Sequence, residues 1–178
     1  MSSVGAGRRR GLLLTAAGFA GVDLAAKALA ETRLGDASVD LGVLQLRLLF
    51  NDGVAFGLGD ALPSWVVVAF TAAVTVAMIV YGWRHAPGAG WVQRLAGGAV
   101  IGGAAANVID RLPDGVVTDY LHTGWWPTFN LADTFPVVGL LIFTLTTFRD
   151  QRPAKPSAPE PGADSGKAAD EPRLLNPW

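Results

Sequence analysis

The chain has no cysteine, only two histidines and six serines, and this narrows the chemistry open to it. Without cysteine there is no disulfide, no thiol nucleophile and no thiolate metal ligand. No serine stands in the Gly-x-Ser-x-Gly context of a nucleophile elbow, and the HExxH motif of zinc proteases is absent. The residues therefore support neither serine, cysteine nor zincin-type protease chemistry.

Charged residues are also scarce, at 16% of the 178 residues, whereas 51% are hydrophobic. This composition is too apolar for an ordinary soluble domain. The charges form no basic stripe of the kind that binds nucleic acid. We therefore predict an integral membrane protein without a nucleic-acid partner.

Four apolar runs are each close to the roughly 20 residues needed to cross the hydrocarbon core of a bilayer. They cover residues 11–30, 64–83, 93–112 and 131–148. The first run could be a signal peptide, but it is long for that and contains Asp23 and Lys27, so we favour a retained span. The predicted fold class is an all-α polytopic membrane protein with four transmembrane helices, in one domain at residues 1–150.

Two segments differ from these runs. Within residues 31–63, apolar and polar residues alternate from Val39 to Leu48, which is typical of a strand. We expect a small extracytoplasmic β-sheet or hairpin there, lying on the membrane surface. Residues 151–178 are rich in Pro, Ala and mixed charge, which predicts a disordered cytoplasmic tail.

Basic residues near the span ends predict the orientation. Under the positive-inside rule both termini are cytoplasmic. The residues on that side are Arg8, Arg9, Arg10, Arg84, Arg94, Arg149, Arg152 and Lys155. Trp65, Trp125 and Trp126 then lie at the outer interface, where we interpret them as an aromatic belt rather than as substrate contacts.

Polar residues are concentrated where the third run ends and the fourth begins. Such groups near hydrocarbon must be paired, hydrated or neutralised, which makes them candidates for function. They are Asn107, Asp110, Arg111, Asp119, His122, Asn130 and Asp133.

Asp119 and Asp133 are the carboxylates best placed to act as a pair. They lie fourteen residues apart on different elements, so they can face each other across the groove between the third and fourth spans. Two carboxylates within about 3 Å share a proton, so one activates water while the other protonates the scissile amide. This aspartic-protease chemistry needs no metal and no cofactor. His122 is interpreted as an interfacial or supporting group.

Structural interpretations of the same acids stay open. Asn130 and Asp133 have the spacing of a helix N-cap and an acidic third residue. A helix N-terminus favours ionised Asp133, so we predict Asp119 as the protonated partner. Asp110 beside Arg111 is interpreted as a charge-compensated pair.

Asp23 and Lys27 lie four apart on one helical face. They form either an ion pair within the first span or a link to the polar cluster.

Five sequence blocks together resemble a known family. They are VDLAAK at 22–27, NDGVAFG at 51–57, GGAAANVIDRL at 102–112, VTDYL at 117–121 and FNLAD at 129–133. Their order and spacing are similar to those of bacterial signal peptidase II, the lipoprotein signal peptidase, an intramembrane aspartic protease. The resemblance covers residues 11–148.

The resemblance implies an endopeptidase that removes signal peptides from diacylglyceryl-modified prolipoproteins at the outer face of the bacterial cytoplasmic membrane. It implies that Asp119 and Asp133 are catalytic and that Asp23 and Lys27 are a structural polar pair. The site-lining or substrate-contacting positions that it implies are Asn51, Gly53, Asn107, Asp110, Arg111 and Asn130. The expected partners are prolipoprotein and membrane lipid, and we expect a monomer.

Three residues depart from the family's usual pattern: Ala106, His122 and Pro136. We expect them to affect substrate range more than catalysis. One alternative function is a catalytically silent paralogue that binds lipidated peptides in envelope assembly. Another is a small proton-coupled transporter, which is disfavoured because the carboxylates cluster at one interface rather than at the bilayer midplane.

Overall fold

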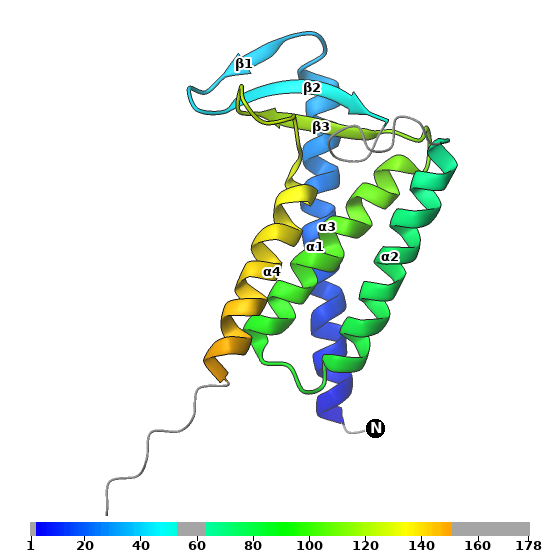
Figure 1. The fold of residues 1–178 in the computed structure, drawn as a ribbon, viewed down its shortest axis with the longest axis vertical. Helices are drawn as coiled ribbons and strands as arrows, with labels where there is room; N and C mark the ends of the chain where they lie inside the picture. Colours follow the sequence, from blue (N-terminus) through cyan, green and yellow to red (C-terminus); the bar gives the residue numbers. More distant parts are fainter. Residues whose placement is uncertain (1–2, 53–62, 151–178) are drawn as a thin grey trace, which may run out of the picture.

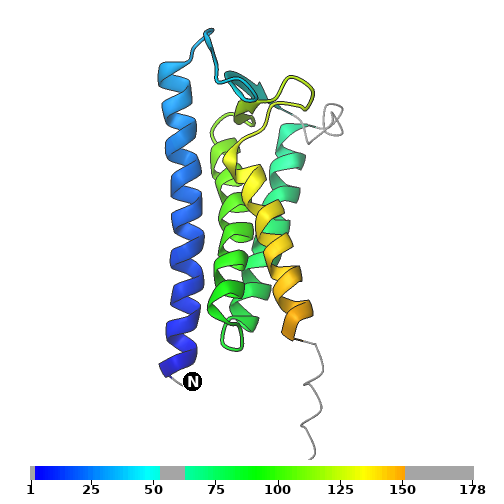
Figure 2. The ribbon, with the colours of Figure 1, turned by 90° about the vertical axis from the view of Figure 1, so that its left-hand side faces the viewer.

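Four helices form the body of the molecule in the computed structural model, which describes residues 3–52 and 63–150 apart from the side chains of Thr147, Arg149 and Asp150. The helices run side by side, and the N-terminus lies at the end opposite a small sheet (Figures 1 and 2). They are α1 (Ser3–Arg33), α2 (Ser64–His85), α3 (Trp91–Arg111) and α4 (Leu131–Asp150). Each coincides with one of the four apolar runs, so the prediction of a helix at each run is confirmed. Gly53 and the proposed tail at 151–178 lie outside the described residues.

The helices differ in how strongly their composition indicates a membrane. Among the described helices, α1 and α2 are long and apolar enough to cross one. A shorter apolar stretch, Leu131–Thr146, makes up most of α4. The last two turns of α3 carry Asn107, Asp110 and Arg111, which lowers its apolar character.

The central helix is α3, which packs against α1, α2 and α4. Small residues permit its close contacts: a Cβ on Gly102 would collide with the backbone of Ala16 in α1, and one on Gly103 with the backbone of Ala132 in α4. Membrane helices associate through such small residues because there is no hydrophobic driving force between helices in lipid.

Pro136 lies in the second turn of α4 and cannot donate the N–H that would reach the carbonyl of Ala132. Gly103 of α3 faces this place, since a Cβ on Gly103 would lie 2.7 Å from Cδ of Pro136. Ala106 is buried one turn away, against Ala20 and Ala132. Two of the departures from the family pattern, Ala106 and Pro136, therefore lie in the contact among α1, α3 and α4.

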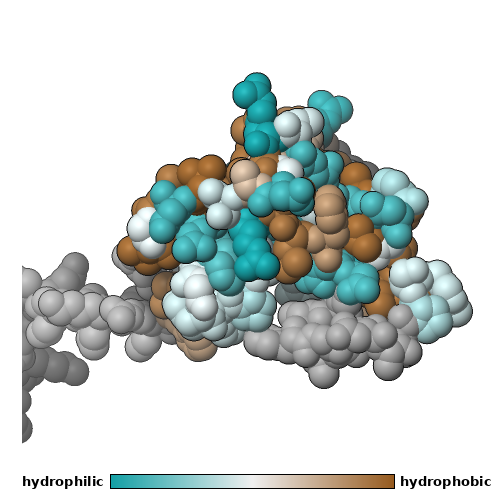
Figure 3. Space-filling model, turned by 90° about the horizontal axis from the view of Figure 1, so that it is seen from above, coloured by the Kyte–Doolittle hydropathy of each residue, from teal (hydrophilic) through white to brown (hydrophobic). Residues whose placement is uncertain are grey.

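The sheet covers one end of the helices. It contains three antiparallel strands in the order β1 (Ser38–Asp40), β2 (Gln45–Asn51) and β3 (Val117–His122). The β1–β2 hairpin confirms the prediction of strands within residues 31–63, whose extracytoplasmic placement stays a prediction, whereas β3 was not predicted. Polar and apolar side chains are interspersed on this end of the molecule (Figure 3). Because β3 carries Asp119 opposite Leu49 of β2, the sheet positions one of the two candidate catalytic acids.

The close contact at Gly102 predicts that a larger side chain there destabilises the packing of α3 on α1. Gly102→Ala should lower the free energy of unfolding by about 1–3 kcal/mol, because the new methyl group meets fixed backbone of α1. The matched control is Gly97→Ala in the same helix, where a Cβ would lie 3.5 Å from a side-chain atom of Leu12, an ordinary contact. Thermal unfolding in detergent measures both variants, and equal midpoints would contradict the packing described for α3.

Candidate active site

Lys27 of α1 is buried, with 2% of its surface exposed. Its ammonium group lies 3.0 Å from a carboxylate oxygen of Asp23 and 3.0 Å from one of Asp110, and it donates to Oδ1 of Asn107 at 2.6 Å. An ammonium group has three donors, so these partners satisfy it. Lys27 thus forms both the ion pair within α1 and the link to the polar cluster of α3.

Asp23 connects α1 with the two elements that carry the candidate acids. Its Oδ1 accepts the backbone N–H of Ala132 at 2.9 Å and, at a longer 3.4 Å, the hydroxyl of Tyr120. Ala132 directly precedes Asp133 in α4, and Tyr120 directly follows Asp119 in β3. Asp23, which is fully buried, therefore helps to place both acids through their neighbours.

Asn130 is the residue that Asp119 and Asp133 share. Its side-chain N–H donates to Oδ1 of Asp119 at 2.7 Å, and its backbone N–H donates to Oδ2 of Asp133 at 3.2 Å. Its Oδ1 accepts the backbone N–H of Asp133 at 2.9 Å, which completes a reciprocal cap at the start of α4. The capping interpretation and the catalytic interpretation of Asp133 are therefore compatible.

Asn107 of α3 contacts Asp133 directly and is linked to Asp119 through Asn130. It donates from Nδ2 to Oδ1 of Asp133 at 2.8 Å, while its Oδ1 accepts from Lys27 and, at 3.2 Å, from Asn130. The ammonium group of Lys27 thus reaches the acids through an amide rather than by direct contact.

Asp119 is 1% exposed and is held by two amides. Its Oδ2 accepts from Nδ2 of Asn51 at 3.0 Å, and its Oδ1 accepts from Asn130. Burial raises the pKa of the Asp119 carboxyl to about 6; the hydrogen bond from Asn51 opposes this and the charge of Asp133 adds to it. Asp119 therefore keeps its proton to a higher pH than an ordinary aspartate, and its role as the protonated partner stays a prediction.

A cavity of about 750 Å³ opens beside the two acids. Its apolar wall comes mainly from α2 and α4, and its polar wall comes from the sheet, the end of α3 and the first turn of α4. The polar wall contains Asn51, Asn107, Arg111, Asp119 and Asp133. Five of the residues predicted for the site are therefore brought together around one space.

Trp125 and Trp126 also line this cavity, although they are 80% and 44% exposed. Their rings meet edge to face, with centroids 5.7 Å apart. Their positions in the sequence predict an aromatic belt and not a place at the cavity. No local pattern could have placed them there, because the loop that carries them is positioned by the pairing of Phe129 with Leu121.

Asp110 is not among the residues that line the cavity. Besides Lys27, it binds the backbone N–H of Thr118 at 2.8 Å and so attaches α3 to the strand that carries Asp119. The hydroxyl of Thr118 donates to Glu31 of α1 at 2.6 Å, a contact that the sequence analysis missed. His122 lies 3.2 Å from the hydroxyl of Thr128 through its Nδ1 atom.

Comparison with known proteins assigns this arrangement to a family. The family model described as signal peptidase (SPase) II matches residues 15–149. The chain belongs to the signal peptidase II family. Signal peptidase II proteins are bacterial membrane enzymes, and membership makes this chain an aspartic-type signal peptidase; cleavage of prolipoprotein signal peptides is the activity of the family.

Individual relatives agree with this assignment. The lipoprotein signal peptidase of Syntrophomonas wolfei is 38% identical over 109 residues, which are 61% of this chain and 71% of the relative. That of Vibrio cholerae is 37% identical over 125 residues, or 67% and 71% of the two chains. A solved structure of a bacterial membrane enzyme matches the fold with a TM-score of 0.65 at 24% identity, covering 81% of this chain and 93% of the other.

The contacts of Lys27 predict a large effect on stability. Lys27→Met should lower the free energy of unfolding by about 3–5 kcal/mol, because it leaves the buried carboxylate of Asp23 without its cation. Arg33→Met is the control, since Arg33 is an exposed cation at the end of the same helix and should unfold like the unaltered protein. Chemical unfolding in detergent compares them, and a loss below about 1 kcal/mol for Lys27→Met would mean that the ion pairs do not hold the helices together.

Proposed function

We propose that Asp119 and Asp133 are the catalytic pair with which this chain removes signal peptides from diacylglyceryl-modified prolipoproteins. One observation carries the assignment: buried Asp119 and more exposed Asp133, from different elements, share Asn130 and line the same cavity. The names of the relatives support the substrate class. Neither acid depends on a metal or cofactor in this role.

In the proposed reaction, ionised Asp133 takes a proton from a water molecule whose oxygen attacks the carbonyl carbon of the scissile peptide bond. Protonated Asp119 gives its proton to the carbonyl oxygen, which yields a tetrahedral diol. Asp119 then recovers a proton from the diol, Asp133 protonates the departing nitrogen, and the carbon–nitrogen bond breaks. Water and amide are consumed, acid and amine are formed, and the pair returns to its starting protonation.

The proposed setting is a membrane crossed by all four helices, with both termini in the cytoplasm and the sheet on the outer face. Arg8, Arg9 and Arg10 of α1, Arg84 of α2 and Arg94 of α3 lie at the end opposite the sheet, which supports this orientation, whereas Lys27, Arg33 and Arg111 lie toward the sheet. The cavity then opens toward lipid between α2 and α4, with the acids near the outer surface. A signal peptide that spans the membrane would present its carboxyl-terminal end there.

Substitution of the proposed pair tests the reaction. Asp119→Asn and Asp133→Asn should each lower kcat/KM for a diacylglyceryl-modified prolipoprotein by roughly 10³-fold or more, since neither variant has both the acid and the base. The assay uses the full chain in detergent or lipid and follows release of the signal peptide.

Asp36→Asn is the matched control, because Asp36 is an exposed acid in the turn before β1. It should cleave like the unaltered protein. Cleavage that persists in folded Asp119→Asn or Asp133→Asn refutes the pair, and no cleavage by the folded unaltered protein favours a silent paralogue.

The raised pKa of Asp119 predicts a pH dependence of stability. Because its pKa is about 6 in the folded chain against 3.8 for an ordinary aspartate, the group contributes stability that is fully present below about pH 4 and lost as pH rises through 6. Asp119→Asn removes this titration, so the stability of the variant relative to the unaltered protein should rise between pH 4 and 7, by on the order of 3 kcal/mol.

The relative stability of Asp119→Asn and the unaltered protein is obtained from their unfolding midpoints, measured in detergent across this pH range. A relative stability of Asp119→Asn that stays constant or falls with pH would contradict the burial of an ionisable Asp119.

A further inference from the structure

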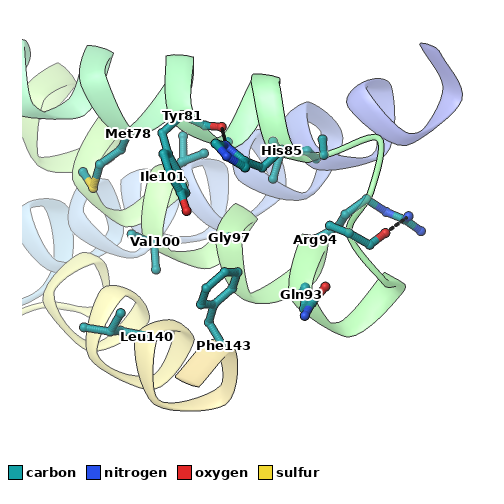
Figure 4. A pocket seen from close by; sticks show the side chains of 14 residues that line it. Met78, Tyr81, His85, Gln93, Arg94, Gly97, Val100, Ile101, Leu140 and Phe143 are labelled. Atoms are coloured by element: carbon teal, nitrogen blue, oxygen red, sulfur yellow. Dashed lines mark hydrogen bonds between the residues drawn. The ribbon is translucent and has the colours of Figure 1, made fainter. Parts of the chain in front are cut away.

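A second cavity, of about 180 Å³, lies at the end of the bundle away from the sheet. All four helices contribute to it, and its floor includes the buried side chains of Leu12 and Ile101. Its sides include Met78, Val100 and Leu140 (Figure 4). Known ligand pockets are several hundred Å³ or more, so this cavity has room for part of a thin apolar chain and not for a whole drug-sized ligand.

The polar residues of this cavity gather at one end. Figure 4 shows His85, Gln93 and Arg94 together near the turn between α2 and α3, whereas Met78 and Ile101 lie away from it. Arg94 donates to the carbonyl of Ala89 at 2.9 Å, so its guanidinium group is held at that turn. The cavity is therefore apolar along its length and carries the cation of Arg94 at the end near this turn, which we call its mouth.

Further cations lie at the same end of the bundle, although they do not line the cavity. Arg8 and Arg9 of α1 donate to the backbone carbonyls of Pro87 and Trp83, and Arg9 lies 5.2 Å from the centre of the Trp83 ring. Arg84 is in the last turn of α2. The described side chains of residues 3–22, 78–100 and 139–146 include no carboxylate. The mouth is complementary to an anion.

We propose that this cavity binds one acyl chain of an anionic phospholipid whose phosphate contacts Arg94 at the mouth. A phospholipid joins the two features that the cavity matches, a thin apolar chain and a negative head group at the membrane surface. Basic pockets between membrane helices bind anionic head groups in this way, and guanidinium groups suit phosphate.

A signal peptide is the competing occupant, and the charge disfavours it. Signal peptides begin with a positively charged segment, which would lie beside the same arginines. The phospholipid is attracted where that segment is repelled. The lipid site is separate from the proposed catalytic pair and does not depend on the proposed reaction.

Lipid binding by the full chain tests the proposal. Native mass spectrometry in detergent, with dioleoyl phosphatidylglycerol and dioleoyl phosphatidylcholine added in equal amounts, should show one bound phosphatidylglycerol in preference to phosphatidylcholine. Arg94→Gln should lower this preference about fivefold, the effect of one basic residue near a lipid surface. Arg10→Gln is the matched control, since Arg10 is exposed, lies at the same end and does not line the cavity.

Gly97→Leu is the second variant, because Gly97 faces the cavity and a leucine side chain there would fill it. It should lose the bound lipid. Gly18→Leu, on α1 where a Cβ would meet nothing within 4 Å, should retain it.

Three outcomes would overturn the proposal. The first is equal binding of the two lipids by the unaltered protein, and the second is the same loss of preference in Arg10→Gln as in Arg94→Gln. The third is full lipid retention by Gly97→Leu together with weakened prolipoprotein cleavage, which would assign the cavity to the signal peptide. Because lipid retention is measured without substrate, loss of catalysis alone leaves the proposal standing.

Discussion

The buried ammonium group of Lys27 is the interaction on which the rest of the site depends. A charge removed from water needs close partners, and those of Lys27 come from both α1 and α3. Asp23, paired with Lys27, extends the same network to the first turn of α4, and Asp110 extends it to β3. One cation thereby determines how three helices and a strand meet, in a region where the helices themselves attract each other only weakly.

Lys27 does not contact the proposed catalytic pair directly. Asp119 and Asp133 receive hydrogen bonds from the amides of Asn51, Asn107 and Asn130, which are neutral donors. A cation in direct contact would favour ionisation of both acids and remove the shared proton that the reaction needs. The amides position the acids without favouring ionisation as strongly as a cation would. Lys27 is separated from Asp133 by Asn107, which binds both.

The sequence alone predicts much of this arrangement, and the unpredicted part has a common physical cause. Apolar length locates the helices, and the spacing of Asn130 and Asp133 predicts the cap of α4, because both are local properties. The third strand, the contact of Glu31 with Thr118 and the place of Trp125 at the cavity all join segments far apart in the chain. Such contacts depend on packing among several elements, and the resemblance to a family supplied site residues that periodicity could not.

The two acids lie on elements of different kinds, a strand of the sheet and the start of a helix. A chain whose helices have entered the membrane, but whose sheet has not yet docked on them, contains both acids without a functioning pair. On the proposed assignment, docking of the sheet on the helices is therefore the step that completes the catalytic pair.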